Sequence, residues 1–266
     1  MFALFVVIIS LSVGLSQCTN KESVALYAKS AVVIDDSGSV LFQKEPHSRL
    51  SPGSMTKLLS LLLVFESIRD NTLTLDERVS ISQNAANTNA SKAGLILGEY
   101  MTVHDLILCV LLPSGSDAVI ALAERISGSQ EAFVERMNER VKELDLNDTH
   151  YSNCVGVEDE NLFSSAYDMS IIALELVSQF PEVLTFSQHK SAIVYHEDGT
   201  PLILENTNDM LGIHGVNGLK TGSTPQSGYS LTMTYPKNGK IRICVIMNSP
   251  TLYCRRQDCM SLLELD

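Results

Sequence analysis

The sequence contains no tryptophan, few other aromatic residues and few cationic side chains. Its 266 residues include 19 Lys and Arg against 31 Asp and Glu, which gives a formal net charge of −12. Because binding to a phosphate backbone depends on clustered cationic side chains, this balance argues against a nucleic-acid partner. Gly-rich nucleotide-binding loops are also missing, and the six His residues lack the spacing of metal ligands. We therefore expect no nucleic acid, no metal and no cofactor.

The six cysteines are too few for a disulfide framework in a chain of this length. Cys109 and Cys244 lie in apolar runs and are predicted to be packed thiols. Cys254 and Cys259 would point in different directions from a C-terminal helix, so they cannot easily bridge each other. We expect reduced or idle cysteines.

The N-terminal run over residues 2–15 carries no charged side chain. It is shorter than the roughly 20 apolar residues of a membrane span and suits the hydrophobic region of a secretory signal peptide. We predict a signal peptide at 1–16 and an extracytoplasmic location, secreted or at the cell surface. The alternatives are a buried apolar N-terminal element and a membrane tether, either through an uncleaved N-terminus or through a lipid on Cys18.

Strand patterns occupy both ends of the chain, and helical patterns fill the middle. The predicted strands cover residues 31–35, 39–44, 192–195, 202–205, 228–235 and 241–248. The predicted helices cover residues 55–68, 103–112, 117–126, 130–144, 165–180 and 252–263. The helix over 55–68 is apolar nearly all round, which predicts a buried central helix.

Strands from both chain ends imply one antiparallel sheet, with the helical block inserted as a second lobe. We therefore predict a mixed α/β (α+β) fold in a single domain over residues 21–266. The sheet lobe would comprise about 21–50 and 190–266, and the helical lobe about 51–189. A cleft between the two lobes is the natural place for a site.

The segment Ser54-Met-Thr-Lys57 places a hydroxyl and an amine three residues apart at the first turn of the predicted buried helix. An amine in apolar surroundings has a lowered pKa and can accept the serine proton, and the helix N-terminus offers N–H groups to an oxyanion. Ser54 and Lys57 are therefore a candidate nucleophile and base. The spacing itself is common, and we attribute a second match, Ser187 to Lys190, to chance because it lacks an apolar helical context.

Two further motifs follow along the chain. Lys220-Thr221-Gly222 is a rare pattern whose lysine and hydroxyl can bind a carboxylate at a strand edge, while the glycine leaves room for a substrate along the strand. Its alternative interpretation is a turn with a surface lysine. Ser114-Gly-Ser116 joins two predicted helices and could place its hydroxyls in the cleft, although by itself it is a generic turn.

In the order Ser-x-x-Lys, Ser-x-Ser and Lys-Thr-Gly, these motifs resemble those of the penicillin-recognising serine acyl transferases. Their surroundings are similar to the low-molecular-mass D-alanyl-D-alanine carboxypeptidases, serine peptidase family S11, over about residues 30–262. The matching segments are Ser51-Pro-Gly-Ser-Met-Thr-Lys57, Leu112-Pro-Ser-Gly-Ser-Asp-Ala118 and His214-Gly-Val-Asn-Gly-Leu-Lys-Thr-Gly-Ser-Thr-Pro-Gln-Ser-Gly-Tyr229. The resemblance implies a β-lactamase/transpeptidase-like fold, with 21–266 as the penicillin-binding catalytic domain.

The resemblance also implies a bacterial cell-wall enzyme that removes the terminal D-alanine from peptidoglycan stem peptides. Ser54 would attack the carbonyl between the two D-alanines, Lys57 would act as its base, and Ser114 would relay a proton to the departing D-alanine. Water would then release the acyl-enzyme, and β-lactam antibiotics would be covalent inhibitors. Many members carry a second β-rich domain and an anchor helix, neither of which we expect within this chain.

The remaining implied roles concern substrate binding. Lys220 and Thr221 would hold the terminal carboxylate, Gly222 would lie beside the substrate, and the N–H groups of Ser54 and Ser223 would form the oxyanion hole. Ser116 departs from the family pattern, which usually has Asn at this position. A hydroxyl is too short to copy the two-ended hydrogen bonding of an amide, so the resemblance predicts weakened catalysis here.

Two other functions stay open. A class A-like β-lactamase shares the motifs and would need a base that deacylates β-lactams quickly. Glu158 and Glu160 follow the middle motif, but no Glu-x-x-Leu-Asn segment is present, and both are more simply loop residues. The second is a catalytically weakened penicillin-binding or wall-sensing domain, which Ser116 suggests.

Overall fold

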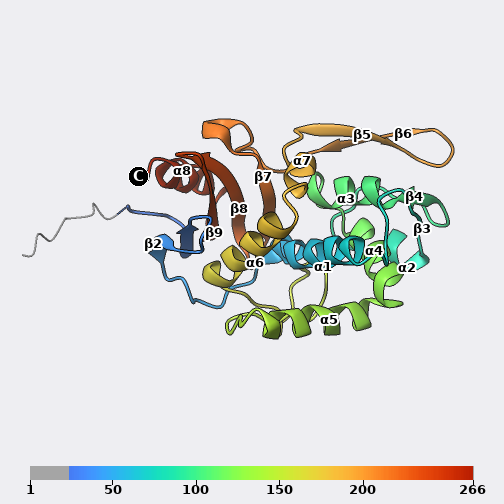
Figure 1. Ribbon diagram of the computed structural model, residues 1–266, viewed down its shortest axis with the longest axis horizontal. Helices are drawn as coiled ribbons and strands as arrows, with labels where there is room; N and C mark the ends of the chain where they lie inside the picture. Colours follow the sequence, from blue (N-terminus) through green and yellow to red (C-terminus); the bar gives the residue numbers. More distant parts are fainter. Residues whose placement is uncertain (1–23, 266) are drawn as a thin grey trace, which may run out of the picture.

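The computed structural model describes residues 24–265, so the predicted signal peptide and Cys18 lie outside the described residues. Its main sheet has five strands in the order β2-β1-β9-β8-β7, and all neighbouring pairs are antiparallel. These strands are β1 (Ser30–Ile34), β2 (Val40–Lys44), β7 (Gly218–Thr224), β8 (Gly228–Lys237) and β9 (Lys240–Ser249). Strands from both ends of the chain therefore meet in one sheet, as predicted (Figure 1).

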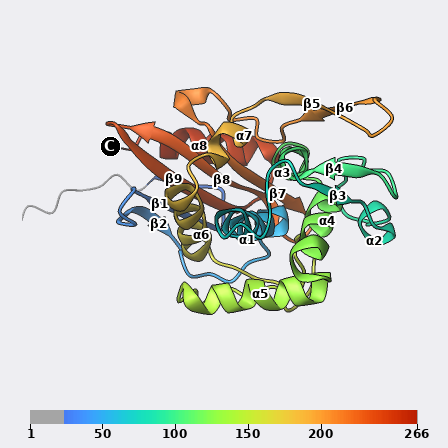
Figure 2. The same cartoon turned by 45° about the vertical axis from the view of Figure 1, so that its right-hand side comes forward.

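Helices cover both faces of this sheet (Figure 2). Helix α8 (Leu252–Leu263) packs against β8 and β9 on one face, and α6 (Ala166–Gln179) packs against β1 and β9 on the other. Successive residues of a strand point to opposite faces. On β9, Cys244 accordingly joins the apolar cluster under α8, whereas Val245 joins the larger cluster on the opposite side.

Helix α1 (Lys57–Arg69) is the central helix of the second lobe, and its residues from Lys57 to Ser67 are buried. It packs against α6, α4 (Ser116–Ser127) and α5 (Gln130–Glu143). Burial on all sides matches its apolar sequence. The predicted start needs a correction, because the 3-10 turn η1 (Gly53–Thr56) precedes the helix. Ser54 therefore lies in this turn, and Lys57 is the first α-helical residue.

The remaining predicted helix is α3 (Val103–Leu111). Thr102 caps its N-terminus, because the Thr102 Oγ1 accepts a hydrogen bond from Asp105 N. Ser129, Ser165 and Thr251 cap α5, α6 and α8 in the same way. Short elements that the sequence patterns did not reveal are β3 (Arg78–Ser80), α2 (Gln83–Ala86), β4 (Tyr100–Thr102), α7 (Val183–Ser187) and η2 (Ile213–Gly215).

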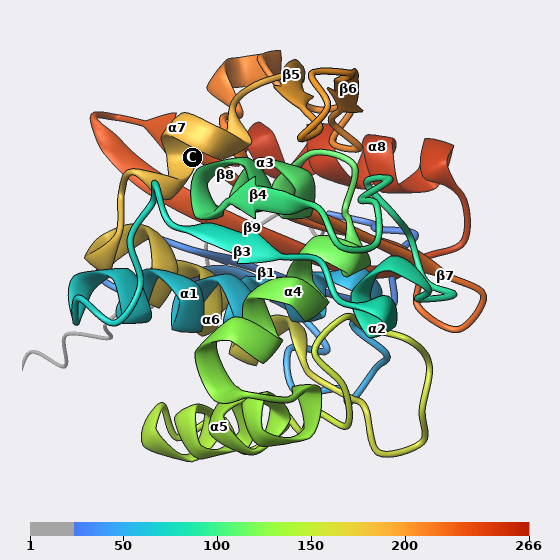
Figure 3. The same ribbon diagram turned by 90° about the vertical axis from the view of Figure 1, so that its right-hand side faces the viewer.

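The hairpin of β5 (Ser191–Tyr195) and β6 (Pro201–Glu205) corrects the predicted sheet lobe. Among the described residues these two strands pair only with each other, so residues from about 190 onward do not all belong to the main sheet. Figures 1 and 3 show the hairpin above α3, beyond the edge of the sheet. Val194 and Leu204 explain this position, because they pack into the apolar cluster of the helical lobe.

Three further properties concern residues 24–265. Cys109, Cys154, Cys244 and Cys259 are buried free thiols, which agrees with the packing predicted for Cys109 and Cys244. No helix in this range has both the length and the apolar character that a bilayer crossing needs. Within the same range, no three His, Cys, Asp or Glu side chains form a group that could hold a metal ion.

Candidate active site

A cavity of about 660 Å³ lies where the edge strand β7 meets the helical lobe. Its wall includes most of the predicted site residues, while Lys57, Lys220 and Gly222 are buried outside the wall itself. The lining residues are Ser54, Ala90, Ser91, Pro113, Ser114, Ser116, Val155, Gly156, Val157, Glu158, Thr207, Thr221, Ser223, Thr224, Pro225, Tyr229, Leu252 and Arg255. Segments that are distant in the sequence therefore converge on one cavity.

Ser54 in the cavity wall and Lys57 buried behind it form a direct pair. The Lys57 ammonium nitrogen donates to Ser54 Oγ at 2.9 Å and to the Val155 carbonyl oxygen at 2.8 Å. Lys57 is 0% exposed, and this burial lowers its pKa from 10.5 to about 7, while the charge of Asp117 opposes the shift. An amine with a pKa near 7 can accept a proton at neutral pH, so the pair can activate a serine nucleophile.

The Val155 carbonyl is held in place by its own loop. Asn153 Oδ1 accepts hydrogen bonds from the N–H groups of Val155, Gly156 and Val157 at 3.3, 2.8 and 3.1 Å. Gly156 also lies against the nucleophile turn, because a Cβ added to it would be 2.0 Å from the Gly53 carbonyl oxygen. Only glycine allows this approach, which brings the acceptor of Lys57 up to η1.

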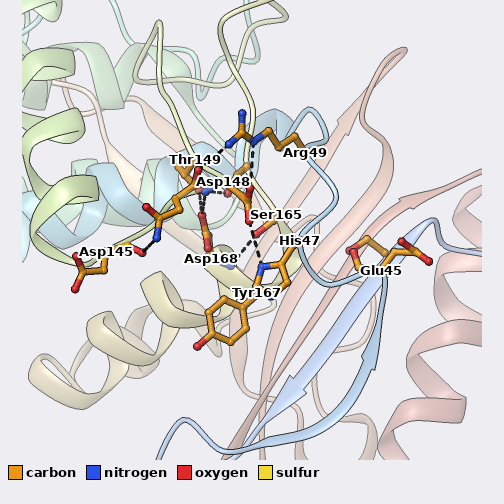
Figure 4. A network of polar contacts seen from close by, with 12 residues as sticks. Glu45, His47, Arg49, Asp145, Asp148, Thr149, Ser165, Tyr167 and Asp168 are labelled. Carbon is orange, nitrogen blue, oxygen red and sulfur yellow. Dashed lines mark hydrogen bonds and ion pairs between the residues drawn. The ribbon is translucent and has the colours of Figure 1, made fainter.

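A polar network anchors the chain that leads to this loop (Figure 4). Asp148 accepts hydrogen bonds from His47 Nδ1 and Arg49 Nε, each at 3.1 Å, so it joins the segment after α5 to the segment after β2. Asp168, in the first turn of α6, accepts from Asp148 N at 2.9 Å and from Thr149 Oγ1 at 2.7 Å. Burial raises the pKa of Asp168. The network therefore fixes both ends of the segment between α5 and α6, which carries Val155.

Ser114 has a conformation that is uncommon for a residue with a side chain. Its φ is 65°, and its Oγ is buried without a hydrogen-bond partner among the described residues. Ser91 Oγ donates to the Ser114 carbonyl oxygen at 2.6 Å, and Gly115 N donates to the Cys109 carbonyl oxygen at 2.8 Å. Strained backbone of this kind is frequent at functional sites. The free hydroxyl of Ser114 in the cavity wall is available to a substrate.

Ser116 begins α4 and is 0% exposed. Its N–H donates to the Ser91 carbonyl oxygen at 2.7 Å, and its Oγ lies 3.3 Å from Ser91 Oγ. The neighbouring Asp117 carboxylate accepts from the N–H groups of Ala93, Gly94 and Leu95 at 2.9, 2.9 and 3.1 Å. Asp117 thus fastens the 91–95 segment to the middle motif, in which Ser116 stands at the position where the family pattern usually has Asn.

Thr221 and Lys220 lie on the edge strand β7 at different depths. Thr221 lines the cavity, and its Oγ1 is 2.6 Å from Thr207 Oγ1. Lys220 is only 1% exposed, and its Nζ donates to the Thr221 carbonyl oxygen at 3.0 Å. Burial lowers the pKa of Lys220 well below its usual value, and the charges of Lys57 and Arg255 add to this shift. Lys220 therefore lies beneath the cavity wall, where its hydrogen bond holds the backbone carbonyl of Thr221.

Gly222 packs against the nucleophile turn, a contact that the sequence did not predict. A Cβ at this position would be 2.6 Å from the Pro52 carbonyl oxygen and 3.3 Å from Met55 N, so the glycine faces η1. Its missing side chain lets β7 pack against the nucleophile turn, and that it also leaves room for a substrate stays a prediction. The same packing brings Ser223, the next residue of β7, close to η1, since a Cβ on Gly53 would be 3.5 Å from Ser223 N. The Ser223 N–H therefore lies beside the turn that carries Ser54.

The arrangement of these motifs agrees with a comparison to known proteins. The family model described as D-alanyl-D-alanine carboxypeptidase matches residues 17–251. The chain belongs to this family. The family predicted from the motifs is therefore confirmed.

Three members of the D-alanyl-D-alanine carboxypeptidase family and its penicillin-binding relatives illustrate the similarity. DacF from Bacillus subtilis is 36% identical over 239 residues, which are 89% of this chain and 61% of DacF. The crystal structure of DacD from Francisella tularensis covers 99% of this chain and 73% of its own at 25% identity, with a TM-score of 0.85. Penicillin-binding protein D2 from Listeria monocytogenes, in its ampicillin-bound form, covers 91% of this chain and 98% of its own at 28% identity, with a TM-score of 0.81.

These comparisons confirm the predicted β-lactamase/transpeptidase-like fold with an antiparallel sheet. The chain spans about 61% of the length of the curated carboxypeptidases that it matches, DacF and the DacA protein of Haemophilus influenzae.

Arg255, Ser91, Thr207 and Glu158 are among the cavity residues of this carboxypeptidase-family site that the sequence did not predict. Arg255 is 2% exposed, and its Nε is buried without a hydrogen-bond partner among the described residues. It lies on α8 next to Arg256, in a segment that gave no motif. Ser91 and Thr207 lie in loops, and Glu158 was interpreted only as a loop residue.

Proposed function

We propose that this domain is a serine-type D-Ala-D-Ala carboxypeptidase that removes the terminal D-alanine from peptidoglycan stem peptides through an acyl-enzyme on Ser54. The observation that carries the proposal is the buried Lys57, whose Nζ is 2.9 Å from Ser54 Oγ and whose pKa is lowered to about 7. A serine that is hydrogen-bonded to a buried amine able to be neutral at pH 7 can act as the nucleophile of an acyl transfer.

In the proposed acylation step, Ser54 Oγ attacks the carbonyl between the two D-alanines while neutral Lys57 takes the serine proton. The oxygen of the tetrahedral intermediate accepts hydrogen bonds from the N–H groups of Ser54 and Ser223, which the packing of β7 on η1 brings together. The C–N bond then breaks, and Ser114, whose hydroxyl has no hydrogen-bond partner within residues 24–265, relays a proton to the leaving amine. Water hydrolyses the resulting ester and restores Ser54.

The departing D-alanine carries a carboxylate, and the cavity wall offers a site for it. The hydroxyl of Thr221 and the guanidinium of Arg255 both line the cavity. Arg255 is fixed by an ion pair from Nη2 to Asp209 and by a hydrogen bond from Nη1 to the Ser230 carbonyl oxygen, and its Nε has no partner in the described chain. The Nε–H can donate a charge-assisted hydrogen bond to a carboxylate. We assign the direct contacts to these two residues, with Lys220 as a positioning residue behind Thr221.

The same site accounts for covalent inhibition by β-lactams, which would acylate Ser54 in place of the peptide. Peptidoglycan lies outside the cytoplasm, so the proposal includes an extracytoplasmic location. A signal peptide at 1–16, a catalytic domain over 21–266 and a possible membrane tether through the N-terminus or Cys18 remain parts of the proposal.

The test measures two reactions of the full chain. D-alanine release from Nα,Nε-diacetyl-L-Lys-D-Ala-D-Ala is expected for the wild type and should be lost in Ser54→Ala. Ser187→Ala is the matched control, since Ser187 begins the second Ser-x-x-Lys match but donates to Asn217 O outside the cavity.

The second reaction is an intact-mass time course with benzylpenicillin. A persistent adduct together with D-alanine release supports the proposal. A persistent adduct without any release would instead indicate a penicillin-binding sensor, and a short-lived adduct with rapid drug hydrolysis would indicate a β-lactamase.

A further inference from the structure

The lining of the cavity contains two charged side chains of opposite sign, Arg255 and Glu158. Glu158 is exposed and lies in the loop after α5, where its Oε1 accepts a hydrogen bond from Gln226 N at 2.6 Å. This contact joins the loop to the connection between β7 and β8. The hydrogen bonds from Thr224 and Gln226 lower the pKa of Glu158, so its carboxylate is ionised and held in position at neutral pH.

The strand β7 gives the cavity a direction, and this step rests on the proposed function. A terminal carboxylate at Thr221 and a scissile carbonyl at Ser223 N place a substrate alongside β7. An extended chain advances about 3.3 Å per residue, so the part of the peptide before the scissile bond runs past Thr224 toward Gln226. Glu158 lies at that end of the wall, because it contacts Gln226.

We propose that Glu158 determines specificity by binding the free side-chain amine of the residue that precedes D-Ala-D-Ala in the substrate. The substrate class is a stem peptide whose third residue carries an unacylated primary amine. Arg255 would pair with the carboxylate at one end of such a peptide, and Glu158 with the ammonium upstream of the scissile bond. An ionised carboxylate accepts several hydrogen bonds, so Glu158 can bind an ammonium and keep its bond from Gln226 N.

The experiment compares two peptides that differ only in this amine, Nα-acetyl-L-Lys-D-Ala-D-Ala and its Nα,Nε-diacetyl counterpart. The wild type should show a kcat/KM about two- to five-fold higher for the free amine, the range expected for an exposed ion pair. Glu158→Gln should bring this ratio close to one, since the amide keeps an acceptor oxygen for Gln226 N but loses the charge. Glu160→Gln is the matched control, because Glu160 is an exposed carboxylate of the same loop outside the cavity wall, and it should keep the wild-type ratio.

The ratio is measured within each variant, so a loss of folded protein does not alter it. The wild-type preference should also shrink when the salt concentration rises from 0.05 to 0.5 M, whereas a preference based on shape would persist. Turnover of both peptides with a wild-type ratio of one, or with a ratio that Glu158→Gln leaves unchanged, refutes the role of Glu158 and leaves the carboxypeptidase function standing. Turnover of neither peptide by the wild type would overturn both proposals.

Discussion

Acylation of Ser54 should depend on pH through the protonation state of Lys57. Burial lowers the pKa of Lys57 from 10.5 to about 7, and only the neutral amine can take the serine proton. With a pKa of about 7, the neutral fraction rises from about 0.09 at pH 6 to about 0.9 at pH 8. The second-order rate constant for acylation should therefore rise about tenfold over this range.

The assay is the rate of adduct formation with benzylpenicillin, followed by intact mass between pH 5.5 and 9. Lys220→Arg is the informative comparison, because arginine does not titrate here and the rising limb should persist if Lys57 is its source. Lys57→Arg should form no adduct at any of these pH values. A rate that stays flat from pH 6 to 8, or that rises only near pH 10.5, would refute the assignment of Lys57 as the base.

Four further predictions concern single substitutions. Because the pKa of Lys57 is lowered on folding, the native state binds fewer protons than the unfolded chain between about pH 7 and 10.5, and the wild type gains stability as the pH rises through this window. Lys57→Met lacks this gain. In urea unfolding, its free energy of unfolding relative to the wild type should therefore fall by about 2 kcal/mol from pH 7 to pH 9. Ser116→Asn should increase D-alanine release, and unchanged or lower turnover would contradict our view that the hydroxyl weakens catalysis. Gly222→Ala should slow penicillin acylation about tenfold or more and lower the free energy of unfolding by about 1–3 kcal/mol, since its Cβ would press on the Pro52 carbonyl. A variant that is acylated at the wild-type rate would show that β7 can shift freely. Asp168→Ala should lower the free energy of unfolding by about 1–3 kcal/mol, because Asp148 N and Thr149 Oγ1 lose their acceptor, and a change below 0.5 kcal/mol would argue against the bracing role of the network.

The sequence was most informative where a local pattern determines the structure. Strand patterns at 31–35 and 39–44 predicted β1 and β2, and the apolar run after Ser54 predicted the buried helix α1. The paired spacing of Ser54 and Lys57 carried the geometry of the site as well, because both residues belong to consecutive turns. Each of these features depends only on residues close together in the chain.

Features that depend on packing between distant elements could not be predicted in this way. The strand patterns at 192–195 and 202–205 predicted β5 and β6 but not that they join the helical lobe, which the buried Val194 and Leu204 decide. The position of Arg255 in the cavity depends on how α8 crosses the sheet. The packing of Gly222 against η1 was not predicted, since nothing in the local sequence shows that the Pro52 carbonyl lies against it.

The hydrogen bond from Lys57 to the Val155 carbonyl joins segments that are 98 residues apart in the chain. In an unfolded chain Lys57 would be solvated, with its ordinary pKa of 10.5, and Ser54 would have no base at neutral pH. Nucleophilicity at Ser54 therefore arises only after the loop around Val155 and the strand β7 have closed on η1. A fluorescent penicillin added during refolding should mark the molecules that have completed their tertiary structure, and the labelled fraction would count native chains directly.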